Sequence, residues 1–250
     1  MSLPLNKIHH GDCLDLMQHL PSGSVDMILC DLPYGTTACK WDTIIPFDKL
    51  WAQYERVIKP NGAIVLTASQ PFTSALVMSN PKMFRHEWIW LKNRGSNFAN
   101  TVREPFKEHE AVLLFSAGKW TYNKQMQQRT REKGSLVGTA LKCAGQSENY
   151  GQTTAYKIEA LPEMRVPSSW QKFNTEVGLH PTQKPVALFE YLIRTYTNPG
   201  EVVLDNCAGS GTTAVAAENT GRRWICMEQE EKYVTIARAR VANLQPMLAL

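Results

Sequence analysis

The sequence predicts a doubly wound α/β fold built on a mostly parallel sheet. Short apolar runs alternate with amphipathic stretches along the 250 residues, and Gly and Pro residues separate them. This alternation is typical of parallel sheets, whose strands are buried on both faces and read as continuous apolar runs. A composition of 43% hydrophobic and 20% charged residues suits one sizeable domain with an insertion, or two small domains.

Seven runs are strand candidates, and three stretches between or after them have helical character. The strand candidates lie near Ile8 and at 25–30, 63–68, 87–91, 111–115, 202–205 and 223–227. The first helix covers residues 47–58, where apolar side chains recur at helical spacing until Pro60 and Gly62 follow. The second covers 186–196, directly after Pro185, and the third covers 230–244.

Residues 117–175 break this alternation with a long polar stretch. The stretch holds nine Lys or Arg residues against four Asp or Glu residues, although the whole chain has a net charge of only +4. A basic excess confined to one segment predicts an insertion that faces nucleic acid on a nearly neutral scaffold. On charge alone, a solvated surface loop is the alternative.

Composition and cysteine usage exclude several classes of protein. No apolar run approaches the length of a membrane span, and the N-terminus has no signal pattern, so we expect a soluble cytoplasmic protein without membrane contact. The six cysteines are scattered and no Cys-x-x-Cys occurs. We therefore expect free thiols, buried at Cys30, Cys207 and Cys226, and no metal site.

A tight glycine turn follows the strand candidate 202–205. Asp205 ends this strand, residues 208–211 form the turn, and a helix begins at Thr212. Glycines let the backbone pass close to a ligand, and a helix N-terminus suits a carboxylate group. Glu228 ends the next strand about twenty residues later, the spacing of an acidic residue that binds ribose hydroxyls. The alternatives are an ordinary strand-to-helix turn and a surface carboxylate.

The tetrapeptide Asp31-Leu32-Pro33-Tyr34 directly follows the apolar run 25–30. With the glycine turn, it resembles the motifs of S-adenosylmethionine-dependent DNA amino-methyltransferases, which modify adenine N6 or cytosine N4. The catalytic motif precedes the cofactor motif, which is the permuted order of the beta group. The resemblance implies a seven-stranded Rossmann-like sheet with one antiparallel strand near its edge. It also implies a catalytic half (1–116), a target-recognition insertion (117–175) and a cofactor-binding half (176–250).

The resemblance implies S-adenosylmethionine as cofactor and duplex DNA as substrate, with the target base flipped out of the helix. An exocyclic amino group is a poor nucleophile, but two rigid acceptors can aim its lone pair at the methyl group. Asp31 would supply one acceptor, the carbonyl of Pro33 or Leu32 the other, and Tyr34 a stacking face. Asp rather than Ser at position 31 favours adenine. Cytosine N4 is the alternative, followed by a protein-glutamine or RNA methyltransferase, or a DNA-binding protein without catalysis.

The same resemblance assigns residues to the cofactor. Asp12, in a Gly-Asp segment, would lie beside the adenine, although it also suits a helix N-cap. The run His180-Pro181-Thr182-Gln183-Lys184-Pro185 matches a family signature before the helix that covers the methionine end. The full cofactor set is Asp12, His180, Thr182, Lys184, Asp205, Ala208, Gly209, Ser210, Gly211, Thr212 and Glu228.

Contacts with DNA are expected from two regions. Lys92 and Arg94 would lie at the rim of the active-site face, close to phosphates. Arg129, Arg131 and Lys133, in the insertion, are candidates for backbone or base contacts. The sequence leaves open the recognition sequence, a homodimer, and a partner restriction nuclease.

Overall fold

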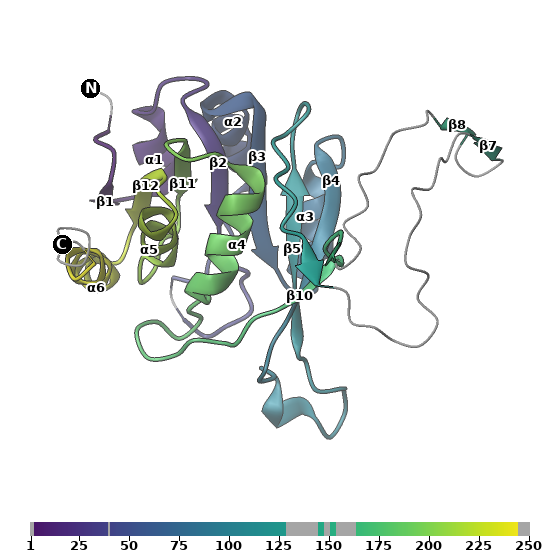
Figure 1. Ribbon diagram of the computed structural model, residues 1–250. Coiled ribbons are helices and arrows are strands. Elements are labelled where there is room, and N and C mark those ends of the chain that lie inside the picture. The colour runs from purple at the N-terminus through teal and green to yellow at the C-terminus, as the bar shows by residue number, and fades with distance from the viewer. Residues whose placement is uncertain (1–2, 40, 129–144, 148–150, 154–163, 245–250) are drawn as a thin grey trace. The chain divides into compact units, whose positions relative to one another are not determined.

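Eight strands form one sheet in the order β1-β12-β11-β2-β3-β5-β4-β10 (Figure 1). Neighbours from β1 to β3 run parallel, β5 runs antiparallel to both β3 and β4, and β10 runs parallel to β4. This computed structural model describes residues 3–39, 41–128, 145–147, 151–153 and 164–244. The strands are β1 (Lys7–His10), β2 (Val25–Cys30), β3 (Ile58–Ala68), β4 (Phe84–Leu91), β5 (His109–Phe115), β10 (Trp170–Lys172), β11 (Val202–Asp205) and β12 (Arg223–Glu228).

All seven predicted strands belong to this sheet, and the antiparallel strand expected near its edge is β5. The eighth strand, β10, lies inside the polar segment 117–175 and was not predicted. It contains three residues, and its place is fixed by long-range hydrogen bonds: Ile89 N–H donates to the Ser169 carbonyl at 2.8 Å, and Phe173 N–H to the Leu91 carbonyl at 3.2 Å. A strand this short leaves no periodic signal in the sequence.

Helices cover both faces of the sheet. On one face, α4, α5 and α6 pack over the side chains of one core cluster, and on the other, α1, α2 and α3 pack over a second cluster. The helices are α1 (Cys13–Gln18), α2 (Phe47–Val57), α3 (Phe72–Ser79), α4 (Val186–Tyr196), α5 (Thr212–Asn219) and α6 (Glu231–Ala242). A short 3-10 helix, η1 (Phe98–Asn100), lies between β4 and β5.

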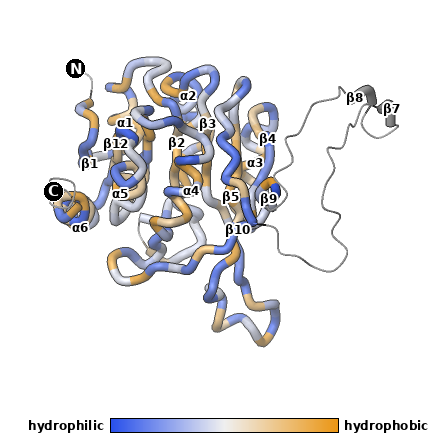
Figure 2. Tube along the Cα trace, viewed as in Figure 1, coloured by the Kyte–Doolittle hydropathy of each residue, from blue (hydrophilic) through white to orange (hydrophobic). Residues whose placement is uncertain are grey.

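The central strand β2 shows why the two faces are equally apolar. Met27 and Leu29 belong to one core cluster, whereas Ile28 and Cys30 belong to the other. Successive side chains of a strand point to opposite faces, so a strand covered on both sides is apolar at most positions. The exception in β2 is Asp26, which pairs with Lys59. Apolar residues accordingly gather in the central strands (Figure 2).

The structure separates a second unit, residues 124–168, from the unit that contains the sheet. Within it, β6 (Gln127–Gln128) pairs antiparallel with β9 (Met164–Arg165), and β7 (Gly145–Ser147) with β8 (Gly151–Thr153). The unit lies inside the predicted insertion. Arg129, Arg131 and Lys133 lie outside the described residues.

None of the helices in the described ranges is long and apolar enough to cross a membrane. Five cysteines fall in these ranges and carry free thiols, of which Cys30 and Cys226 are buried and Cys207 is partly buried.

A buried hydrogen bond ties α2 to the end of β11. The Tyr54 hydroxyl donates to Asn206 Oδ1 at 2.6 Å, and the side chains of both residues are shielded from solvent. Asn206 directly follows Asp205, so this bond fixes the chain where the strand leaves the sheet. If the donor is removed, the buried acceptor has neither a protein partner nor water, which lowers the free energy of unfolding.

We therefore expect Tyr54→Phe to lower the free energy of unfolding by about 1–3 kcal/mol. Urea unfolding followed by circular dichroism measures this loss. Tyr122→Phe, which removes the same atom from a ring that is 38% exposed, is the matched control and should change stability by less than about 0.5 kcal/mol. Equal losses in the two variants would contradict the role given to Tyr54.

Candidate active site

One cavity of about 1030 Å³ opens at the edge of the sheet where the parallel strands end. Because β2, β11 and β12 run parallel, the segments that follow them meet at this edge, although they are far apart in the sequence. All predicted catalytic residues line the cavity: Asp31, Pro33 and Tyr34. So do the predicted cofactor residues Asp12, His180, Thr182, Lys184, Asp205, Ala208, Gly209, Ser210, Thr212 and Glu228. Gly211 is not among the lining residues.

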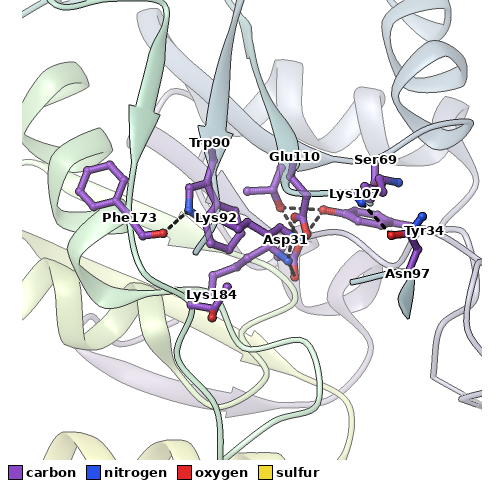
Figure 3. A network of polar contacts seen from close by, with 12 residues as sticks. Asp31, Tyr34, Ser69, Trp90, Lys92, Asn97, Lys107, Glu110, Phe173 and Lys184 are labelled. Atoms are coloured by element: carbon purple, nitrogen blue, oxygen red, sulfur yellow. Dashed lines mark hydrogen bonds and ion pairs between the residues drawn. The ribbon is translucent and has the colours of Figure 1, made fainter. Parts of the chain in front are cut away.

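Asp31 follows β2 and is held from three directions. Its Oδ2 accepts the Lys184 ammonium at 2.6 Å, and its Oδ1 accepts the Tyr34 hydroxyl at 2.8 Å and the Thr67 hydroxyl. These contacts fix the carboxylate in one orientation (Figure 3). A carboxylate with two oxygens can accept about four hydrogen bonds, so one position on Oδ2 remains for a further donor.

Tyr34 packs against Phe72, with ring centroids 5.1 Å apart and an interplanar angle of 25°. The Lys184 ammonium lies 5.7 Å from the centroid of the Tyr34 ring. Burial raises the pKa of the Tyr34 hydroxyl well above its ordinary value, and the charges of Asp31 and Glu110 add to the shift. The hydroxyl is therefore a neutral donor to Asp31 at physiological pH.

Leu32, the second residue of the tetrapeptide, is 4% exposed and belongs to the core cluster that also contains residues of α1, α2 and α3. The residue also borders the cavity. The assignment of a carbonyl acceptor to Pro33 or Leu32 stays a prediction.

Asp42 fixes the loop that follows the tetrapeptide. The sequence analysis did not identify this role of Asp42. Its carboxylate accepts the backbone N–H groups of Gly35, Thr36 and Thr37 at 2.9, 2.9 and 2.7 Å. Burial opposes the charged form, but these hydrogen bonds outweigh it and lower the pKa of Asp42. Three backbone donors on one carboxylate form a rigid turn beside Tyr34.

Glu110 and Thr67 are further members of the site that the sequence did not reveal. Thr67 lies near the end of β3, and Glu110 is the second residue of β5. Since β5 runs antiparallel to β3, its first residues lie at the edge where the parallel strands end. The sequence did predict the strand that contains Glu110. It could not show how this strand is aligned with β3, and so it could not show that Glu110 lies at the site.

Lys92 lines the cavity, but the prediction that it lies at the rim close to phosphates is wrong. Its side chain is 5% exposed, and its ammonium pairs with Glu110 Oε1 and lies 5.1 Å from the centroid of the Trp90 ring. The physical reason is the pairing of β4 with β5, which brings the Glu110 carboxylate beside the end of β4. Arg94 is exposed and lines the cavity, as expected for a rim residue.

The acidic residues of the second half shape the other end of the cavity. Glu228 Oε2 accepts Gly209 N–H at 2.7 Å, and Oε1 accepts Glu230 N–H at 2.8 Å. Asp205 accepts Cys207 N–H at 3.0 Å and the Thr213 hydroxyl. Asp205 thus braces the turn after β11, and Glu228 connects that turn with the segment after β12.

The glycine turn needs its glycines. Gly209 and Gly211 have φ values of +51° and +80°, which L-residues with side chains rarely adopt. A Cβ on Gly211 would lie 2.9 Å from the Cβ of Ala237, so α6 also packs against the turn. Among the described residues, no side chain caps the N-terminus of α5, so its first backbone N–H groups are available to an anionic group.

His180 closes over this turn. Its ring lies between the rings of Trp41 and Tyr233, with centroid distances of 5.0 and 4.2 Å. His180 Nδ1 accepts Thr182 N–H at 3.2 Å, and burial lowers the pKa of the ring. The imidazole is therefore a neutral wall of the cavity.

Asp12 caps α1: its Oδ1 accepts Leu14 N–H at 2.7 Å and Asp15 N–H at 3.4 Å. The alternative role as a helix N-cap is thus confirmed, while its place beside an adenine stays a prediction. The described cavity combines a carboxylate for hydroxyl donors, an uncapped helix N-terminus and aromatic walls. This combination of groups fits a ligand that carries a ribose and a carboxylate group.

Comparisons with known proteins agree with this reading. The family described as "DNA methylase" matches residues 25–239. The type II methyltransferase M.HinfI of Haemophilus influenzae is 27% identical over 97% of this chain and 70% of its own. M2.MboI of Moraxella bovis is 26% identical over 96% of this chain and 89% of its own. The protein in the crystal structure of the M1.HpyAVI–SAM complex is 27% identical to this chain. The match covers 94% of this chain and 98% of that protein, with a TM-score of 0.62.

Asp205 gives a pH dependence of stability. Burial raises its pKa from 3.8 to about 6, although hydrogen bonds from Thr213 and Cys207 oppose the shift. The folded state therefore holds the proton more tightly than the unfolded state, and the free energy of unfolding falls as pH rises towards and through 6. Asp205→Asn removes this term, so wild type should lose about 1.4 kcal/mol relative to the variant between about pH 5 and about pH 7.5. Parallel pH profiles of the two proteins in thermal unfolding would contradict the assignment.

Proposed function

Because the chain belongs to the DNA methylase family, we propose that it transfers a methyl group from S-adenosylmethionine to adenine N6 in a specific sequence of duplex DNA. The family modifies exocyclic amino groups at adenine N6 or cytosine N4. The order of motifs, with Asp31 before the glycine turn at 208–211, is that of the beta group.

The observation that carries this proposal is the single cavity shared by Asp31 and the glycine turn. A methyl donor held by the turn and an amino group held by Asp31 would be brought together without a large movement of the protein. Such alignment of two reactants is a major source of catalysis.

The cofactor supplies an electrophilic methyl group on a sulfonium centre. Glu228 would accept hydroxyl groups of its ribose, because each carboxylate oxygen keeps a free position beside the backbone donor it already holds. The N-terminal amides of α5 would bind its carboxylate, and the ring of His180 would cover it.

Asp31 then acts on the target amino group. It accepts one amino hydrogen, which aims the nitrogen lone pair at the methyl carbon. The bound cofactor would supply the methyl group for the new N–C bond, and its sulfur would keep the electron pair of the broken S–C bond. The nitrogen gains positive charge in this step and releases its surplus proton, for which Asp31 Oδ2 is the nearest acceptor in this arrangement.

The choice of adenine rests on Asp31, since Asp begins this motif in adenine-N6 enzymes and Ser in cytosine-N4 enzymes. Tyr34 and Thr67 both hold Oδ1 of the carboxylate, which suits a fixed acceptor better than a mobile base. Incubation with unmethylated bacterial DNA and digestion to nucleosides decides between the bases. N6-methyladenosine supports the proposal, and N4-methylcytidine would replace it with the cytosine alternative.

DNA would approach the mouth of this cavity. Arg94 lies there, and the nearby loop between β4 and β5 carries Phe98 and Val102, which are 82% and 86% exposed. Exposed apolar side chains next to a basic residue suit a surface that contacts distorted DNA. The segment 117–175 is proposed as the target-recognition region because its basic excess exceeds that of the rest of the chain.

Asp31→Ala should abolish methyl transfer but leave cofactor binding within about twofold of wild type, because Glu228 and the glycine turn are intact. Transfer of label from tritiated S-adenosylmethionine and titration calorimetry measure the two properties separately. Normal transfer by the variant would remove Asp31 from the reaction.

Replacing Arg129, Arg131 and Lys133 by Gln should weaken DNA binding and flatten its salt dependence. Each lost phosphate contact reduces the slope of log K against log [salt] by about 0.9, so three contacts reduce it by about 2.7. Fluorescence anisotropy over a salt series provides the slope. The control is a double variant, Lys7→Gln with Lys82→Gln, at the amino ends of β1 and β4. If the triple variant has the same slope as this control, then Arg129, Arg131 and Lys133 do not contact the DNA.

A further inference from the structure

Four charged side chains, one of them the catalytic carboxylate of Asp31, form a continuous series of ion pairs (Figure 3). The Lys92 ammonium pairs with Glu110 Oε1, Glu110 Oε2 lies 3.5 Å from Lys184 Nζ, and Lys184 Nζ lies 2.6 Å from Asp31 Oδ2. The two lysine side chains are 5% and 6% exposed. Two cations and two anions thus alternate in a nearly dry environment, where each charge depends on its neighbours.

The two oxygens of Glu110 are not equivalent. Oε1 accepts the Lys92 ammonium, whereas Oε2 is shielded from solvent and has no hydrogen-bond partner among the residues that the structure describes. Its contact with Lys184 is electrostatic, without the geometry of a hydrogen bond. A buried carboxylate oxygen without a donor is costly, so its retention needs a reason.

Lys184 stands in the way of the proposed chemistry at Asp31. Its ammonium draws the negative charge of Oδ2 away from an incoming amino group. It also places a cation beside a nitrogen that becomes positive during methyl transfer. Burial lowers the pKa of Lys184, but the charges of Asp31 and Glu110 outweigh burial and raise it. The amine therefore stays charged, and relief must come from movement rather than from loss of a proton.

We propose that Glu110 is a positioning residue that takes the Lys184 ammonium from Asp31 when the target amino group binds. Oε2 is the acceptor within reach: a shift of well under 1 Å turns the 3.5 Å contact into a hydrogen bond of ordinary length. The lysine chain has four flexible methylene groups, so the ammonium can move without displacement of the backbone. This inference rests on the proposed function for its purpose, but the movement itself can be observed without it.

A crystal structure of Asp31→Ala tests the movement directly and needs no substrate. The variant deprives Lys184 of its first partner, so we expect the ammonium to form a hydrogen bond with Glu110 Oε2. An ammonium that points into the cavity instead, away from Glu110, would overturn the proposal. Because no methyl transfer is involved, this result stands even if the protein modifies no DNA.

Kinetics of Glu110→Gln test the purpose of the movement. Without the charge of Glu110, Lys184 stays on Asp31, and kcat should fall roughly ten- to a hundredfold, the range for one charged hydrogen bond. The dissociation constant for S-adenosylmethionine, measured by calorimetry without DNA, should not change. Glu108→Gln, the same substitution at an exposed position in the same segment, is the control and should keep wild-type kcat. Equal kcat in the two variants would overturn the proposal.

A double variant separates positioning from a general structural role. If Glu110 acts through Lys184, then Lys184→Met should cause no further loss of kcat in the Glu110→Gln background, because it removes the ammonium that would otherwise stay on Asp31. Losses that multiply as independent effects would overturn the proposal. Failure of the wild-type protein to methylate DNA would instead contradict the proposed function, and the Asp31→Ala structure would still decide where Lys184 goes.

Discussion

The parallel pairing of β2 with β11 is the constraint on which the site depends. The register sets Val203 beside Met27 and Leu204 beside Ile28, so Asp31 and Asp205 leave the sheet at the same edge. These strands come from opposite ends of the sequence. Their pairing allows a catalytic motif that precedes the cofactor motif in the chain to share one cavity with it. The ion pair of Lys184 with Asp31, 153 residues apart, closes the connection.

The site contains buried charged groups that destabilise the folded protein. Asp205 is 3% exposed, and its raised pKa means that its charge destabilises the folded protein at neutral pH. Oε2 of Glu110 is buried and has no hydrogen bond within the described parts of the chain. Burial of the two apolar clusters, one on each face of the sheet, stabilises the fold and offsets the unfavourable free energy of these buried charges. Preorganised charges of this kind are what a reaction that creates positive charge on nitrogen requires.

The sequence predicted the strands well because central parallel strands are apolar at most positions, as in β2 and β11 apart from Asp26 and Asp205. It also located Asp31 and the glycine turn, since their chemistry depends on local spacing. It missed β10, whose three residues are held only by long-range hydrogen bonds, and it placed Lys92 at the rim. Glu110 and Thr67 were missed for the same reason: which side chains face one another across β3, β4 and β5 depends on register, which only the folded sheet determines.

The most direct test of the account is a crystal structure of the protein with S-adenosylhomocysteine, the product of the methyl donor. The account predicts that the ligand occupies the cavity between Asp31 and the glycine turn, with its ribose hydroxyls at Glu228 and its sulfur facing the tetrapeptide. A ligand bound elsewhere, or bound in this cavity with its sulfur directed away from Asp31, would contradict the claim that the two motifs form one active site.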